Sequence, residues 1–176
     1  MVANRRADIG ILVLTEQDIK EFRIEVRQLG LEVHSLDRSS AYVCMGPHSA
    51  LYDRDYVDTE DIKKSPHVAL DLERTMRREL RYREIYQWIN KERLIFCNTA
   101  GACRKFLEET DMIMFVPKWA IGLFQDDKLR CVPFKINGKD YPKVNQLVWV
   151  KRANEDFHPL EEEFKNLLSA QFSGQE

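Results

Sequence analysis

The sequence predicts an α/β fold, because short apolar runs of strand length alternate along the chain with stretches whose apolar residues recur at helical spacing. The composition is that of an ordinary globular protein: 44% of the 176 residues are apolar, 32% are charged and only seven are glycines. A chain of this length buries a substantial core and is expected to form one domain or two small lobes.

The first predicted elements are a strand and a capped helix. Apolar residues run together over residues 7–14 instead of alternating, which predicts a strand buried on both faces. A helix is expected over residues 16–29, with Thr15 as its N-cap, Asp18 three residues later and Gly30 as its stop. Its buried stripe is predicted to consist of Ile19, Phe22, Val26 and Leu29.

The next stretch is first β-rich and then mixed. Strands are predicted over residues 31–36 and 40–45, with a polar break at Asp37-Arg38-Ser39 between them and a loop opened by Gly46-Pro47 after them. A short helix is expected over residues 59–64, shortly before Pro66. An extended segment over residues 68–72 leads into the longest helix candidate, which covers residues 74–91.

The central part shows the alternation most clearly. Strands are predicted over residues 93–97, 112–116 and 129–135, with a helix over residues 101–109 and another opened by Pro117. Such alternation implies parallel pairing through right-handed crossovers. The turn Asn137-Gly138 then leads to a strand over residues 146–151. A closing helix is expected over residues 159–172, with the apolar stripe Leu160, Phe164, Leu167 and Leu168.

Composition and motifs disfavour several classes of function. No apolar run approaches the roughly 20 residues of a membrane span, and no secretory signal is recognisable, so the cytoplasm is the expected location. The formal net charge of −2 gives no overall attraction to nucleic acid. The cysteines lack the C-x-x-C spacing of zinc or redox sites and are expected to be reduced, buried residues: Cys44, Cys97, Cys103 and Cys131.

The sequence also offers no catalytic or metal-binding constellation. The four histidines lack the short-range spacing of metal ligands, and no serine or cysteine sits in a recognisable nucleophile motif. The glycines are scattered singly, so no phosphate-binding loop is present. Neither catalytic residues nor a metal or cofactor is therefore predicted.

Four segments carry a resemblance when they are taken in order: residues 6–11, 43–51, 57–62 and 157–164. The first is similar to a G-x-x-D-hydrophobic-hydrophobic strand, the second to an apolar strand followed by a His-Pro-Leu-like loop, and the third to a hydrophobic-x-x-x-Asp-Leu helix. With the fourth, which is similar to the start of a closing helix, they resemble the effector-binding domain of LysR-type transcription regulators. The family's Ala-Gly-hydrophobic-Gly is replaced at residues 107–112.

The resemblance implies a fold like that of type 2 periplasmic binding proteins, with two α/β lobes joined by two crossover segments. Residues 1–41 and 142–176 would form the first lobe and residues 42–141 the second, with crossovers near residues 40–43 and 135–143. The family's winged helix-turn-helix, its linker helix and the first two strand–helix units would lie before Met1. The first lobe is therefore expected to be incomplete and the chain to be an N-terminally truncated regulator.

The candidate effector site lies at strand ends. Asn98, Thr99 and Ala100 follow a predicted strand and open a helix, where open α/β sheets bind ligands and free amides attract anions. An ordinary threonine cap explains Thr99 equally well.

The other candidates have competing structural explanations as well. Leu14 and Thr15 hold the corresponding position in the first lobe, where a helix cap is favoured over a ligand contact. Phe115, Val116 and Pro117 end the next strand and are expected to form an apolar pocket wall. Core packing explains Phe115 equally well, and Pro117 suits the first position of a helix. Five arginines within residues 74–83 fit a solvated helix face better than a phosphate site.

The resemblance implies a regulatory domain that binds a small-molecule effector, for which a carboxylate metabolite is the candidate. Its other partners would be further copies of the chain, in a dimer or tetramer. Promoter DNA would be contacted only through the absent winged helix-turn-helix, and no membrane is involved. Regulation would be allosteric and non-covalent, through differential affinity of the effector for two arrangements of the lobes. The alternative is a stand-alone solute-binding protein or an enzyme of the same two-lobed fold, which a secretion signal or an acid/base pair in the cleft would favour.

Overall fold

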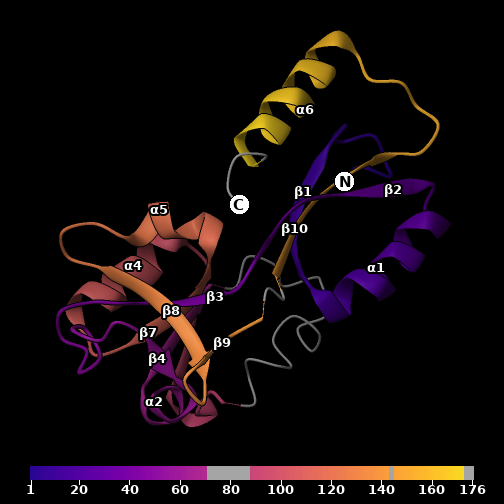
Figure 1. Cartoon of the computed structure of the whole chain (residues 1–176). Coiled ribbons are helices and arrows are strands. Elements are labelled where there is room, and N and C mark those ends of the chain that lie inside the picture. Colours follow the sequence, from indigo (N-terminus) through magenta and orange to yellow (C-terminus); the bar gives the residue numbers. More distant parts are fainter. Residues whose placement is uncertain (71–87, 143–144, 173–176) are drawn as a thin grey trace. The chain divides into compact units, whose positions relative to one another are not determined.

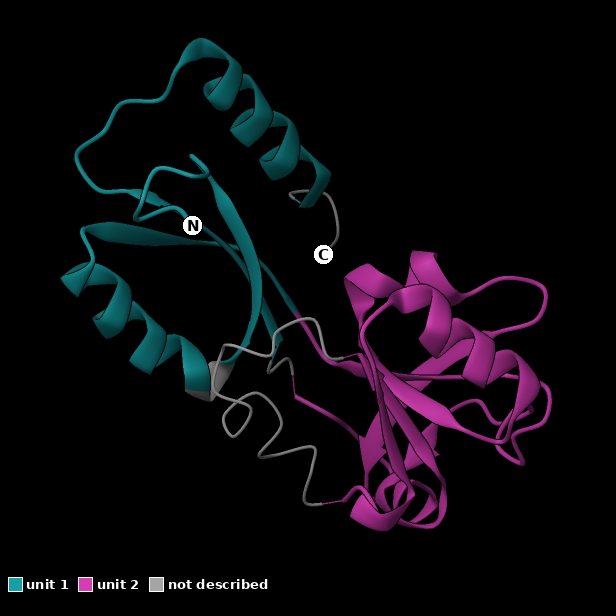
Figure 2. Cartoon of the chain, turned by 180° about the vertical axis from the view of Figure 1, so that it is seen from behind, with its two compact units in different colours: residues 1–38, 144–176 teal, residues 39–143 magenta. Residues whose placement is uncertain are grey.

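The computed structural model describes residues 1–70, 88–142 and 145–172, which fall into two compact units (Figure 2). Unit 1 comprises residues 1–38 and 144–176, and unit 2 comprises residues 39–143. The helix predicted over residues 74–91 lies mostly outside the described residues. Its last described part, residues 88–90, is a turn that precedes the 3-10 helix η1 (Lys91–Arg93).

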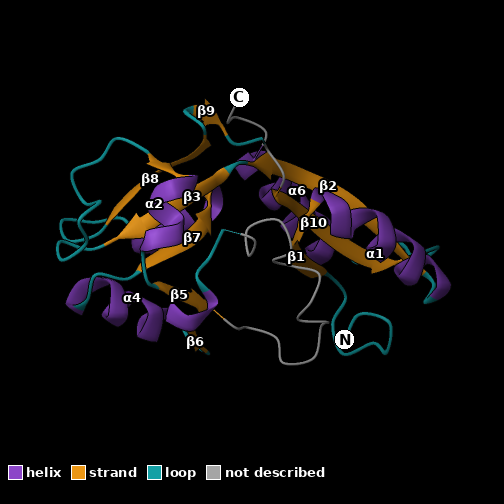
Figure 3. Ribbon diagram, turned by 90° about the horizontal axis from the view of Figure 1, so that it is seen from below, coloured by secondary structure: helices purple, strands orange, loops and turns teal. Residues whose placement is uncertain are grey.

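Unit 1 contains a three-stranded sheet in the order β1–β10–β2 (Figure 1). Its strands are β1 (Gly10–Thr15), β2 (Leu31–Ser39) and β10 (Asn145–Arg152), and β1 runs antiparallel to β10. Helix α1 (Glu16–Gln28) covers one face of this sheet (Figure 3). Its residues Ile19 and Val26 are buried in clusters with Val148 and Val150 of the central strand.

The local signals around α1 are confirmed. The hydroxyl of Thr15 accepts a hydrogen bond from the amide of Asp18, and Gly30 follows the helix with a φ of +69°. That backbone conformation favours glycine and ends the helix. Leu29, however, is 62% exposed, because it occupies the C-cap and lies beyond the last turn that packs on the sheet.

Two predictions about the strands of unit 1 are wrong. Ile11 and Val13 of β1 are 47% and 36% exposed, so this strand is not buried on both faces. The reason is that α1 covers only the alternate residues, which point to the opposite side of the sheet. Strand β2 also continues to Ser39 instead of breaking at Asp37, because strand hydrogen bonds use the backbone and tolerate polar side chains on a half-exposed strand.

The closing helix α6 (Pro159–Phe172) has the predicted bounds but not the predicted packing. Leu160, Phe164 and Leu167 are 70%, 44% and 65% exposed, while Leu168 is half-buried. Helical periodicity identifies an apolar stripe but does not identify what covers it. In the described part of the chain, this stripe faces solvent.

Unit 2 contains a seven-stranded sheet in the order β4–β8–β3–β7–β5–β6, with β9 paired to β8. Its strands are β3 (Ala41–Met45), β4 (Val57–Asp58), β5 (His67–Leu70), β6 (Leu94–Cys97), β7 (Ile113–Pro117), β8 (Arg130–Ile136) and β9 (Lys139–Asp140). Strand β5 is parallel to both β6 and β7, as the alternating pattern predicts. Strand β3 is antiparallel to β7 and β8, so the sheet is mixed.

Three helices complete the described part of unit 2: α2 (Thr59–Lys64), α4 (Ala100–Glu109) and α5 (Ile121–Phe124). Helix α4 packs on the sheet through Cys103 and Leu107, which share a buried cluster with Cys44, Val68 and Met114. At Gly46, directly after β3, a β-carbon would lie 1.8 Å from the carbonyl oxygen of Leu107. The backbone of α4 thus approaches the end of β3 as closely as only glycine permits.

Candidate functional site

The carboxyl ends of three neighbouring parallel strands lie at one edge of the sheet in unit 2. Because β5 is parallel to both β6 and β7, these strands end on the same side of the sheet. Strand β6 is followed there by residues 98–100, and β7 ends at Pro117, opposite Ala41 at the start of β3. Residues 97–101 and 115–118 are called the carboxyl edge below. Ligands of open α/β sheets bind at such edges.

The turn after β6 presents free backbone donors. Thr99 is the N-cap of α4: its hydroxyl accepts from the amide of Ala102, and its carbonyl accepts from the amide of Cys103. Among the described residues, no hydrogen bond uses the amides of Ala100 or Gly101, and both residues are exposed. A β-carbon at Gly101 would meet nothing within 4 Å, so the space beside this residue is open.

The charge around this turn favours an anion. The first turn of α4 contains no acidic residue that would compete with a bound carboxylate. The exposed amides also lie at the positive end of the dipole of a ten-residue helix. Unpaired amides at such a helix end form a site for carboxylate or phosphate oxygens. The cap that explains Thr99 and an anion site at Ala100 and Gly101 thus coexist.

The residues that end β7 are more deeply engaged in the core. Val116 is buried in the cluster under α4, and half-buried Phe115 stacks on His67 with ring centroids 6.0 Å apart. Phe115 also meets Phe134 edge-on at 5.2 Å. The structure therefore gives these two side chains a packing role, and their contact with an effector stays a prediction. Pro117 is half-buried at the end of the strand.

Pro117 does not open an α-helix directly, contrary to the prediction. It is the N-cap of the 3-10 helix η2 (Lys118–Ala120), and the four-residue helix α5 follows. Ser39, which is only 2% exposed, holds this turn: its hydroxyl accepts a 2.8 Å hydrogen bond from the amide of Lys118 and donates to the carbonyl of Ser40. Sequence reasoning missed Ser39, because its partner lies 79 positions away.

Leu14 and Thr15 belong to unit 1, and each unit is described by itself. Leu14 is buried in a cluster with Ile19 and Val148. Thr15 caps α1, and its hydroxyl lies 2.7 Å from a carboxylate oxygen of Asp18. The favoured interpretation of Thr15 as a helix cap is confirmed, and its contact with an effector stays a prediction.

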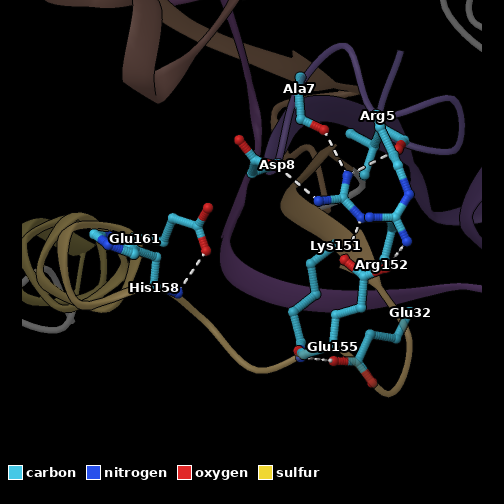
Figure 4. Close-up of polar contacts among 10 residues, drawn as sticks. Arg5, Ala7, Asp8, Glu32, Lys151, Arg152, Glu155, His158 and Glu161 are labelled. Atoms are coloured by element: carbon cyan, nitrogen blue, oxygen red, sulfur yellow. Dashed lines mark hydrogen bonds and ion pairs between the residues drawn. The ribbon is translucent and has the colours of Figure 1, made fainter.

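A second polar cluster, in unit 1, is fully engaged by the protein itself (Figure 4). Arg152, at the end of β10, donates to the carboxylates of Asp8 and Glu155 at 2.7 and 2.5 Å. It also donates to the carbonyls of Val2 and Ala7 at 3.1 and 2.9 Å. Four acceptors around one guanidinium hold the segment before β1 against β10. This arrangement is a structural clamp rather than an anion site.

Other chemistry is not indicated by the described residues. Within residues 1–70, 88–142 and 145–172, no group of three or more His, Cys, Asp or Glu side chains is placed to hold a metal ion. No helix in these ranges is long and apolar enough to cross a membrane. All four cysteines are free thiols: Cys44, Cys97 and Cys103 are buried as predicted, and Cys131 is half-buried.

The sequence profile of the LysR substrate binding domain matches residues 1–173 of this chain. No curated protein sequence matches it. Reduced OxyR from Porphyromonas gingivalis is 15% identical, with a TM-score of 0.65 over 99% of this chain and 74% of that one. The regulatory domain of MetR, a LysR family regulator from N. meningitidis, is 13% identical, with a TM-score of 0.64 over 97% and 72% of the two chains. The reduced OxyR regulatory domain from Pseudomonas aeruginosa is 12% identical, with a TM-score of 0.64 over 97% and 74%. At these identities the likeness concerns the fold.

Proposed function

The chain belongs to the family of LysR substrate binding domains, and we propose that it senses a small carboxylate-bearing effector at the carboxyl edge of unit 2. The observation that supports this proposal is the pair of exposed, unpartnered amides at Ala100 and Gly101. These donors match the geometry in which a carboxylate accepts hydrogen bonds from a helix N-terminus. The neighbouring polar groups of Asn98 and Thr99 supply further contacts for orientation.

The proposed effector site also draws on the other predicted residues. Pro117 and the half-buried ring of Phe115 supply apolar wall at the same edge, with Val116 supporting them from the core. Contacts of Leu14 and Thr15 with an effector remain proposals for unit 1 taken by itself. Binding is non-covalent and involves no catalytic step, metal or cofactor. An effector of this kind acts only if it binds one arrangement of the regulator more tightly than another.

We further propose that the domain works in a cytoplasmic homo-oligomer. The exposed apolar side chains of β1 (Ile11, Val13) and of α6 (Leu160, Leu167) support this, because soluble proteins usually cover such surface with a partner. Promoter DNA is proposed to be contacted by a winged helix-turn-helix of the full regulator. The effector then changes DNA binding indirectly, through the oligomer, and makes no contact with the DNA.

Ala100→Pro gives a sharp test of the effector site. Proline is well tolerated at the first position of a helix and removes only one N–H group. Thr99, which precedes it, already has the extended backbone that a following proline requires (φ −138°, ψ 147°). Ala100→Ser is the matched control, since it changes the side chain and keeps the amide.

The measurement is a thermal-shift screen of the chain against small mono- and dicarboxylates, followed by calorimetric titration of each hit. A ligand at 100 times its Kd stabilises the folded state by about 2.7 kcal/mol. We expect Ala100→Pro to weaken binding roughly tenfold, the value of one hydrogen bond to a charged group, and Ala100→Ser to bind normally. If both variants bind the carboxylate with equal affinity, the N-terminal end of α4 is not part of the effector site.

A further inference from the structure

Two of the four thiols face each other across neighbouring strands. Cys44 of β3 lies directly opposite Cys131 of β8 in the antiparallel register, and Tyr42 lies opposite Pro133 in the same pair of strands. Proline has no N–H, so Tyr42 and Pro133 cannot form a pair that exchanges two hydrogen bonds. Because paired positions alternate between the two kinds, Cys44 and Cys131 also form a non-hydrogen-bonded pair.

This position suits a covalent link between the strands. Residues in non-hydrogen-bonded pairs have α-carbons about 4.5 Å apart, and their side chains lie closest. Disulfides span α-carbon separations of roughly 4.4–6.8 Å. Both thiols also lie on the same face of the sheet, at the buried cluster under α4 and α5. They are thus placed for bond formation without movement of either strand.

The two thiols differ in access and acidity. Cys44 has no exposed surface, whereas Cys131 is half-buried. The hydrogen bond between them raises the pKa of the Cys44 thiol, and burial raises it further. The same hydrogen bond lowers the pKa of Cys131, against an opposing effect of burial. Cys131 is therefore the more exposed member of the pair and the one that forms a thiolate more readily.

We propose that Cys44 and Cys131 form an oxidisable dithiol that is a modification site for a hydroperoxide. The thiolate of Cys131 attacks the peroxide and its sulfur is oxidised to a sulfenic acid. The O–O bond breaks, and the leaving oxygen takes up the proton that the Cys131 thiol released, so that an alcohol or, from hydrogen peroxide, water is formed. The Cys44 sulfur then attacks the sulfenic sulfur, and the sulfenic hydroxyl leaves as one water with the proton of the Cys44 thiol as the disulfide forms. Overall, two thiols and one hydroperoxide give one disulfide, one alcohol (or water) and one water.

The disulfide would join the fourth residue of β3 to the second residue of β8. Strand β3 begins two residues after Ser39, and β8 ends at the hairpin formed by Asn137 and Gly138. Oxidation would thus fix the relative position of β3 and β8. It is chemically independent of the carboxyl edge, because none of the amides proposed to bind the effector takes part.

The test is hydrogen peroxide treatment of the folded chain, followed by blocking of free thiols and mass spectrometry of unreduced peptides. We expect a peptide linked through Cys44 and Cys131, reversed by dithiothreitol, and a melting temperature that is higher in the oxidised form. Cys97→Ser combined with Cys103→Ser is the matched control, because this second thiol pair belongs to the same cluster. The control should form the same link.

Single variants separate the two roles. In Cys44→Ser, Cys131 should accumulate as a sulfenic acid that dimedone traps, whereas Cys131→Ser should leave Cys44 unlabelled. The proposal is overturned if peroxide leaves both thiols free to alkylate, if Cys131 is oxidised past sulfenic acid without forming a link, or if the link joins Cys97 and Cys103 instead.

Discussion

The carboxylate of Asp58 accepts a 2.7 Å hydrogen bond from the amide of Gly138, although the two residues lie 80 positions apart. It also accepts from the amide of Asn137 at 3.2 Å and from that of Thr59 at 2.6 Å. One side chain therefore caps helix α2 and holds the β8–β9 hairpin, whose two turn residues have φ values of 52° and 73°. Positive φ at both positions is typical of the tight turns that join antiparallel strands.

Asp58→Ala is expected to lower the free energy of unfolding by about 2 kcal/mol, because it removes a helix cap and leaves two turn amides without their acceptor. Urea denaturation monitored by tryptophan fluorescence measures this change. Asp55→Ala is the matched control, since Asp55 is exposed and its loss should cost less than about 0.5 kcal/mol. If both variants lose a similar free energy of unfolding, Asp58 does not hold α2 and the β8–β9 hairpin together.

The hydrogen bonds to the Asp58 carboxylate also predict that the free energy of unfolding falls at acidic pH. Burial raises the pKa of the Asp58 carboxyl, but hydrogen bonds from Gly138, Thr59 and Asn137 outweigh it and hold the pKa below its ordinary value. A carboxyl whose pKa is depressed on folding stabilises the protein fully above its unfolded pKa of about 3.9 and loses this effect as the pH falls through the folded value. Asp58→Asn should remove that part of the stability loss below about pH 4.

Local signals were sufficient to predict much of the fold. The Thr15 cap, the stop at Gly30, the Asn137-Gly138 turn and the bounds of α2 and α6 depend on residues within a few positions of one another. Such patterns are physical consequences of backbone hydrogen bonding and φ preferences. For the same reason, the turn at Asn98 and Thr99 was predicted at a strand end, where the structure has it.

Long-range relationships could not be predicted in the same way. The sequence shows that β1 and α6 are apolar, but the exposure of Ile11 and Leu160 depends on which element covers each face. Ser39 was assigned to a polar break because its hydrogen-bond partner, the amide of Lys118, is distant in the chain. Cys44 and Cys131 show no motif, since only the strand register brings them together.

His67 predicts a second pH effect in a separate range. His67 is 1% exposed, and this burial lowers the pKa of its ring to about 4. A hydrogen bond with the Ser65 carbonyl opposes the shift. Nδ1 lies 3.0 Å from that carbonyl oxygen, which can only accept, so the neutral ring carries its proton on Nδ1. Among the described residues, Nε2 has no hydrogen-bond partner. Protonation in the folded state would therefore bury an uncompensated charge.

A histidine whose pKa falls on folding stabilises the protein above its unfolded pKa of 6.5, and this contribution is lost as the pH falls toward the folded value. Between pH 7 and pH 5 the free energy of unfolding should decrease by about 2 kcal/mol through this residue. His67→Phe should flatten the dependence of the urea midpoint on pH in that range. His48→Asn, at an exposed position, should keep it; an unchanged slope in His67→Phe would assign the effect elsewhere.

Gly46→Ala tests whether the close approach of β3 and α4 positions the carboxyl edge. The added β-carbon would lie 1.8 Å from the Leu107 carbonyl oxygen and 2.8 Å from its carbon, and both atoms belong to the helix backbone. The helix must move as a whole, at a cost of about 2 kcal/mol or more in the free energy of unfolding. Gly122→Ala is the matched control, because a β-carbon there meets nothing within 4 Å.

Since α4 also carries the amides of Ala100 and Gly101, Gly46→Ala should weaken carboxylate binding in calorimetric titration at a temperature where the variant is folded. Destabilisation with undiminished affinity would mean that the end of α4 is positioned by β6 and its cap alone.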